Sequence, residues 1–177
     1  MAAPDIMAWH DFFVTIAQVG ATLAGLLFVG LTISLSHLLQ GRGYLNRAFT
    51  ALFLQFETLV IGLCGLIPGQ PMYVLGIEFA ATGLLFLMGI RIFAHHFRED
   101  ENSAVLGSLG PRAVRATLAY IATLFPVICG ALLILNVRGA LYWLMPAEIA
   151  CLYLSIGNAW VFAVEIPRRQ AQKNDQT

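Results

Sequence analysis

The sequence predicts an all-α fold, a polytopic integral membrane bundle of about five transmembrane helices. The chain has 177 residues, of which 59% are apolar and only 11% are charged. Soluble domains are roughly 45–50% apolar and about 25% charged. The apolar residues also form long runs that short segments of glycine, proline and charged residues interrupt. We therefore expect one transmembrane helical domain over residues 1–169 and a solvated tail over residues 170–177.

The interruptions between apolar runs set the expected helices, taken in order along the chain. The first run carries no formally charged side chain over 12–41, and GRGYLNR at 41–47 ends it. Proline and glycine in PGQP at 68–71 stop one helix and start the next. A polar segment and then Arg138 separate the remaining runs, and Pro146 suits the first turn of the last helix. The expected helices cover about 8–39, 45–67, 72–97, 112–137 and 141–166.

Basic residues predict the orientation of these helices. Arg138 is the one Lys or Arg that falls on the same side as the N-terminus. Positive charge accumulates on the cytoplasmic side of membrane proteins, so we expect the N-terminus outside and the C-terminus in the cytoplasm. Trp9, Tyr73, Tyr142 and Trp143 fall at the expected outer boundary, as an interfacial aromatic belt would. The basic residues expected in the cytoplasm are Arg42, Arg47, Arg91, Arg98, Arg112, Arg115, Arg168, Arg169 and Lys173.

Two expected helices carry a row of polar or small residues at steps of three, four or seven, which places each row along one side of its helix. Such rows face one another, line a wet path, or serve as contact surfaces between membrane helices, and packing alone is the more common role. The first row is Thr15, Gln18, Thr22, Gly25, Thr32 and Ser36. The second row is Glu148, Cys151, Ser155, Asn158 and Glu165.

Acidic residues within the apolar runs are candidates for function. Glu57 lies near the middle of the second expected helix, where an isolated carboxylate costs at least about 2.5 kcal/mol. It is either a functional acid or one partner of a structural contact. Asp11, Glu78 and Glu148 are expected near the outer ends of helices and together predict an acidic mouth that attracts cations. For Glu148, an acid stabilised by the helix dipole is the alternative.

Two further contacts are expected at the cytoplasmic end. Arg91 either pairs with Glu57 or meets Glu165 there. His95 and His96 stand four residues before acids and offer a weak divalent-metal or pH-sensing pattern, with solvated interfacial charges as the more common reading. We therefore predict no metal site.

Several function classes are disfavoured. The sequence contains no GxSxG, HExxH or phosphate-loop pattern, so we expect neither an enzyme nor a bound cofactor. Ten basic and ten acidic residues balance, so nucleic acid is not an expected partner. The three cysteines stand singly in apolar runs and are expected to pack as small residues.

A resemblance covers most of the chain. The stretch WHDFFVTIAQVGATLAGLLFVGLTISLSHLL, followed by LIPGQP and by NAWVFAVEI, resembles a family of small bacterial inner-membrane proteins. Some members are named modulator of FtsH protease. The resemblance implies a multi-pass protein of the bacterial inner membrane, and an accessory role beside a membrane-bound protease.

Two functional hypotheses follow. The first is a homo-oligomeric channel for cations or protons, with the polar rows lining its path and the acids selecting cations. The second is a non-conducting accessory or regulatory subunit whose polar rows dock another membrane protein, with basic segments that contact the lipid bilayer. The channel is preferred because the rows are long, and it requires oligomerisation because a five-helix monomer has little room for a pore.

Overall fold

The computed structural model describes residues 6–33, 42–96, 112–160, 164 and 168. All long elements in this part of the chain are α-helices, which confirms the all-helical prediction. Short 3-10 helices precede α1 and α6. The elements are η1 (Ile6–Trp9), α1 (His10–Ile33), α3 (Arg42–Gly65), α4 (Met72–His96), α5 (Arg112–Ile134), η3 (Ala140–Trp143) and α6 (Leu144–Trp160).

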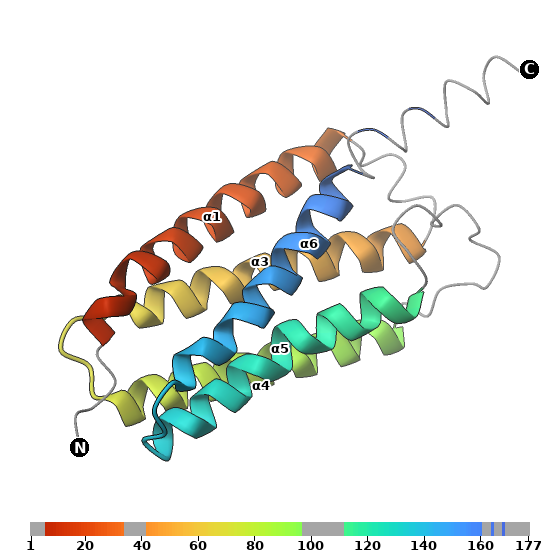
Figure 1. The fold of residues 1–177 in the computed structure, drawn as a ribbon. Helices are drawn as coiled ribbons and strands as arrows, with labels where there is room; N and C mark the ends of the chain where they lie inside the picture. The colour runs from red at the N-terminus through yellow and green to blue at the C-terminus, as the bar shows by residue number, and fades with distance from the viewer. Residues whose placement is uncertain (1–5, 34–41, 97–111, 161–163, 165–167, 169–177) are drawn as a thin grey trace, which may run out of the picture.

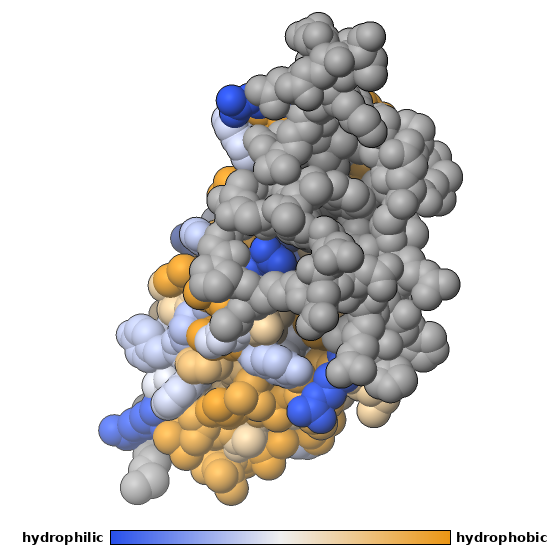
Figure 2. Space-filling model, turned by 90° about the vertical axis from the view of Figure 1, so that its right-hand side faces the viewer, coloured by the Kyte–Doolittle hydropathy of each residue, from blue (hydrophilic) through white to orange (hydrophobic). Residues whose placement is uncertain are grey.

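Five helices, one of them including η1 and another η3, are long and apolar enough to cross a membrane, as predicted. Large apolar side chains on every helix point outward, such as Phe28, Phe56, Leu85, Leu124 and Ile156. Hydrophobic side chains gather at the lower centre of the view in Figure 2, with hydrophilic ones beside them. A surface of this kind is suited to lipid rather than to water.

The helices run alongside one another (Figure 1). The start of α1, the turn between α3 and α4, and η3 lie at one end of the bundle; the end of α1, the start of α3 and the end of α6 lie at the other. The PGQP sequence forms the turn between α3 and α4, where Gly69 has a φ of 70° that favours glycine. Helix α3 is central, since α1, α4 and α6 all pack against it.

Glycines allow two pairs of helices to approach closely. On α3, a Cβ added at Gly62 would lie 2.8 Å from the Cβ of Ala17 on α1. On α4, a Cβ added at Gly76 would lie 2.7 Å from the carbonyl oxygen of Gly130 on α5. Both distances are too short for a real Cβ, so each pair packs backbone to backbone, as small residues allow in membranes.

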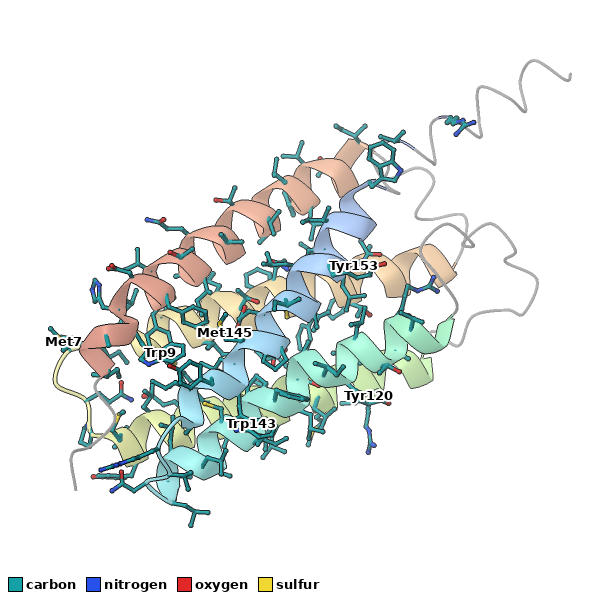
Figure 3. The ribbon with its side chains drawn as sticks, viewed as in Figure 1. Met7, Trp9, Tyr120, Trp143, Met145 and Tyr153 are labelled. Atoms are coloured by element: carbon teal, nitrogen blue, oxygen red, sulfur yellow. The ribbon has the colours of Figure 1, made fainter. Side chains whose placement is uncertain are left out.

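Aromatic residues gather at the end of the bundle that holds η3. The ring centroids of Trp9 and Tyr142 are 4.9 Å apart, and those of Phe125 and Trp143 are 5.5 Å apart. Trp9 and Trp143 lie toward this end in Figure 3, whereas Tyr120 and Tyr153 lie farther along the bundle. The contacts tie η1 and α5 to η3, and amphipathic rings of this kind suit a membrane interface.

Candidate functional site

The polar row of α6 lies inside the bundle. The exposed fractions are 5% for Glu148, 2% for Cys151, 0% for Ser155 and 5% for Asn158. Steps of three and four residues put these side chains on one side of the helix. Exposed apolar residues such as Ile149, Tyr153 and Ile156 cover the opposite side of α6.

Helix α3 contributes a second group of polar side chains that faces this row. Gln55, Glu57 and Thr58 are at most 1% exposed. The side-chain amide of Gln55 donates to the hydroxyl oxygen of Ser155 and, at 3.5 Å, to the carbonyl oxygen of Cys151. The thiol of Cys151 lies 3.9 Å from the carbonyl oxygen of Leu54 and donates to it. These contacts join α3 to α6 through polar groups.

The two acids of this region share one environment. Glu57 and Glu148 lie close enough for their charges to interact, and Thr58 lies beside Glu148. None of the four carboxylate oxygens has a hydrogen-bond partner among the described residues. We call Gln55, Glu57, Thr58, Glu148, Cys151 and Ser155 the α3–α6 cluster.

The polar row of α1 lies on the outside of the bundle. The side chains of Thr15, Gln18, Thr22 and Thr32 are exposed, and an added Cβ at Gly25 would meet open space. The hydroxyl of Thr15 donates to the carbonyl oxygen of Asp11, and that of Thr22 to the carbonyl oxygen of Gln18, each at 2.7 Å. The hydroxyl of Thr32 donates at 2.7 Å to the carbonyl oxygen of Val29. The threonines therefore satisfy their hydroxyls within their own helix.

Asp11 extends this outward row by one further step of four residues before Thr15. Its side chain is exposed, and one carboxylate oxygen lies 3.4 Å from Nδ1 of the neighbouring His10. We call Asp11, Thr15, Gln18, Thr22, Gly25 and Thr32 the α1 row.

The two polar rows therefore do not face one another. The α6 row packs against α3, while the α1 row points away from the bundle. The inner side of α1, which carries Phe13, Ala17 and Gly20, is the side that packs on α3. Of the three roles considered for the rows, contact between them is absent, because small, apolar residues occupy the contact side of α1 and polar residues occupy its free side.

The acids expected at one outer mouth lie in three different environments. Asp11 is exposed on α1, and Glu78 is partly buried and accepts a hydrogen bond of 2.6 Å from the side-chain amide of Gln70. Glu148 is buried in the α3–α6 cluster. Because α6 begins at Leu144, Glu148 also lies beyond the first turn, so a helix-dipole role at the first turn does not describe it.

The structure describes some of the remaining predicted residues and not others. Arg91 is exposed on α4, so it does not pair with the buried Glu57. Ser36 and Glu165 lie outside the described residues, as do the side chains of His95 and His96. Within the described part of the chain, no group of three or more His, Cys, Asp and Glu side chains is arranged to hold a metal ion.

Sequence reasoning singled out Glu57 but missed Gln55 and Thr58. The signal was present, because QFET places three polar side chains within four residues of an apolar helix. Such a concentration of polar residues inside a membrane span indicates a contact with another polar helix. The partner of this segment is the polar row on α6, and the sequence analysis did not pair the two.

Comparison with known proteins identified no relative of this chain. The chain matches no protein-family model, and neither a curated protein nor a solved structure is significantly similar to it.

Proposed function

We propose that this multi-pass protein is a homo-oligomeric channel for cations or protons in the bacterial inner membrane, with the α1 row facing the path. The observation that carries the proposal is the outward direction of the α1 row. Gln18 lies near the middle of the span Ile6–Ile33, and its exposed amide has no hydrogen-bond partner among the described residues. An amide that faces lipid at this depth is costly, so water or another subunit is its expected neighbour.

Asp11 supports selection for cations. It lies in the first turn of α1, close in sequence to Trp9 at the end of η1. In a closed oligomer, each subunit would bring one Asp11 carboxylate to the mouth of the path, and carboxylate rings favour cations. With the N-terminus outside, as basic residues predict, this mouth is the outer one.

An oligomer is needed because side chains fill the interior of the bundle. Phe13, Leu75, Phe79, Leu133 and Leu144 form a buried core at one end of the helices. A second buried core around Leu54, Ala122, Cys151 and Leu154 fills the bundle farther along. A continuous path is therefore expected between subunits rather than within one.

Ion flux into liposomes that contain the purified protein tests this proposal. The variant Thr22→Trp places a large ring on the α1 row and should block flux. The matched control is Leu85→Trp, which puts the same ring on an outward position of α4 and should leave flux unchanged. Asp11→Asn should lower the preference for cations over anions, because it removes a charge at the mouth. Folded protein that conducts neither cations nor protons over a range of pH and voltage would contradict the proposal.

A second candidate is an accessory or regulatory subunit that docks another membrane protein through the α1 row. The observation in its favour is that Thr15, Thr22 and Thr32 donate to carbonyls of their own helix and so need no water. Threonine and glycine are common at helix–helix contacts in membranes. A docking role of this kind is the one that the resemblance to modulators of the FtsH protease implies. Photocrosslinking from position 22 in intact membranes separates the two roles, because it yields either a second copy of the chain or a different protein.

A further inference from the structure

We propose that Glu57 and Glu148 form a proton-binding site inside each subunit, where each carboxyl takes up and releases a proton. The inference concerns the α3–α6 cluster and does not depend on the α1 row or on the path proposed for it. The ligand is the proton itself, and the two carboxyls are the groups that carry it.

The cluster has fewer hydrogen-bond donors than acceptors, because the hydroxyls of Thr58 and Ser155 are the donors left for its unpartnered oxygen atoms. Its oxygen atoms without a hydrogen-bond partner among the described residues are Oε1 of Gln55, both carboxylate oxygens of Glu57 and of Glu148, and Oγ1 of Thr58. The side-chain amide of Gln55 is already used on Ser155 and Cys151, and the thiol of Cys151 points to Leu54. A proton added to a carboxylate turns one acceptor oxygen into a donor, and so reduces the excess of acceptors in the cluster.

The cluster also lacks a compensating charge. His10 and Asp11 form an ion pair with each other on the exposed side of α1, outside this buried cluster. Among the arginines whose side chains are described, Arg91, Arg138 and Arg168 are exposed and Arg115 is partly buried near the start of α5, and none of them lies close enough to Glu57 or Glu148 to interact with its charge. Two carboxylates that are buried together without a cation carry a large desolvation penalty and repel one another, and protonation removes both costs.

The other groups around the two acids do not supply a positive charge. On α6, Cys151 is the described titratable side chain next to them, and a thiol is neutral or negative. On the α1 side, Ala17 and Gly20 pack on α3 near Gly62 and Thr58 and carry no titratable group. The surroundings therefore favour the neutral, protonated form of both acids.

The row on α6 offers a route for exchange. Ser155 and Asn158 continue the buried polar side of α6 from Glu148 toward Trp160. From Glu148 to Asn158 this row extends for about 15 Å at 1.5 Å per residue. Brief local opening of the bundle along this polar row admits water, so that a carboxyl oxygen loses its proton to water and regains one from it.

Infrared spectroscopy of the purified protein in lipid tests the inference, because a protonated carboxyl has a C=O stretching band that a carboxylate lacks. At pH 7, exposed carboxyls are ionised, since their ordinary pKa is about 4. We expect a protonated band in the wild type. Glu57→Gln and Glu148→Gln should each remove about half of it, and Asp11→Asn, which changes an exposed carboxyl, should leave it unchanged. Transfer to D2O should shift the band, because the protons exchange with solvent.

Glutamine has the shape of a protonated glutamate, so both variants are expected to fold, and circular dichroism checks this. The wild-type measurement stands even where a variant does not fold. Absence of the band at pH 7 would overturn the inference, because the carboxyls would then be ionised beside a bound cation. If the band keeps its intensity in both folded variants, the protonated carboxyls are not Glu57 and Glu148, which would also overturn the inference. A band that does not shift in D2O would show fixed structural protons and would overturn the exchange. None of these results bears on flux along the α1 row.

Discussion

The polar rows of α1 and α6 have nearly the same spacing and opposite environments. Both rows advance by steps of three and four residues, with one step of seven on α1. On α6 the row is buried, and it makes hydrogen bonds to α3 through Ser155 and the backbone of Cys151. On α1 the row is exposed, and its threonines bond to their own backbone.

The difference shows what a polar periodicity in a membrane helix means. Spacing identifies a side of the helix, but the neighbouring helices decide whether that side faces protein or lipid. Threonine and glycine are acceptable on either surface, since a threonine hydroxyl can bond to its own helix and glycine carries no side chain. The buried α6 row differs from the α1 row because its serine makes a hydrogen bond to another helix. The following predictions test this contrast, from the largest expected effect to the smallest.

The largest effect is expected from the same bulky substitution in the two rows. Ser155→Leu forces a larger side chain into a fully buried position and leaves the amide of Gln55 without its partner. It should lower the free energy of unfolding by about 2–4 kcal/mol, from overpacking and a lost buried hydrogen bond. Thr22→Leu should change it by less than about 0.5 kcal/mol. Unfolding in mixed detergent micelles measures both free energies. Equal losses of stability would contradict a buried α6 row and an exposed α1 row.

A smaller effect is expected from adding one methyl group on either side of α1. Gly62→Ala brings a Cβ to 2.8 Å from Ala17 and should destabilise the bundle by about 1–3 kcal/mol. Gly25→Ala meets open space and should be neutral or slightly stabilising, because alanine favours helix by up to about 1 kcal/mol. Thermal unfolding of the two variants compares them. Tolerance of alanine at Gly62 would contradict the close contact between α1 and α3.

The smallest effect on folding is expected from replacing two glutamines, one on α3 that bonds to the α6 row and one within the α1 row. Gln55→Leu removes hydrogen bonds between α3 and α6 and should cost about 1 kcal/mol of folding stability, without changing the oligomeric state. Gln18→Leu should leave the stability of the subunit unchanged but weaken the proposed assembly along α1. Mass photometry of both variants in detergent checks the second outcome. Assembly that survives Gln18→Leu and fails in Gln55→Leu would reverse the assignment of the two surfaces.

Much of the architecture was accessible from the sequence. Charge-free runs and the PGQP segment predicted five membrane-spanning helices, because the length and hydropathy of a span follow from the bilayer itself. The row singled out on α6 lies on the buried side of that helix for Glu148, Cys151, Ser155 and Asn158. The helix start at Leu144 was less accessible, because η3 uses apolar residues that read as part of the same helix.

The pairing of helices was not accessible in the same way. Glu57 and Glu148 are 91 residues apart in the sequence and meet because α6 packs against α3. Glu148 was expected at an outer mouth, since position along a helix indicates depth but not the neighbouring helix. Gly62 and Ala17 carry the contact that turns the polar side of α1 outward, and nothing local in either helix specifies that partner.

Cross-linking with a short, membrane-permeant thiol reagent tests the central contrast most directly. The background replaces Cys64, Cys129 and Cys151 with alanine, and it carries either the pair Gln55→Cys and Ser155→Cys or the pair Thr22→Cys and Ser155→Cys. We predict a cross-link within one chain for the first pair and none within one chain for the second. A cross-link within one chain between positions 22 and 155, with none between 55 and 155, would place the two rows face to face and contradict the account.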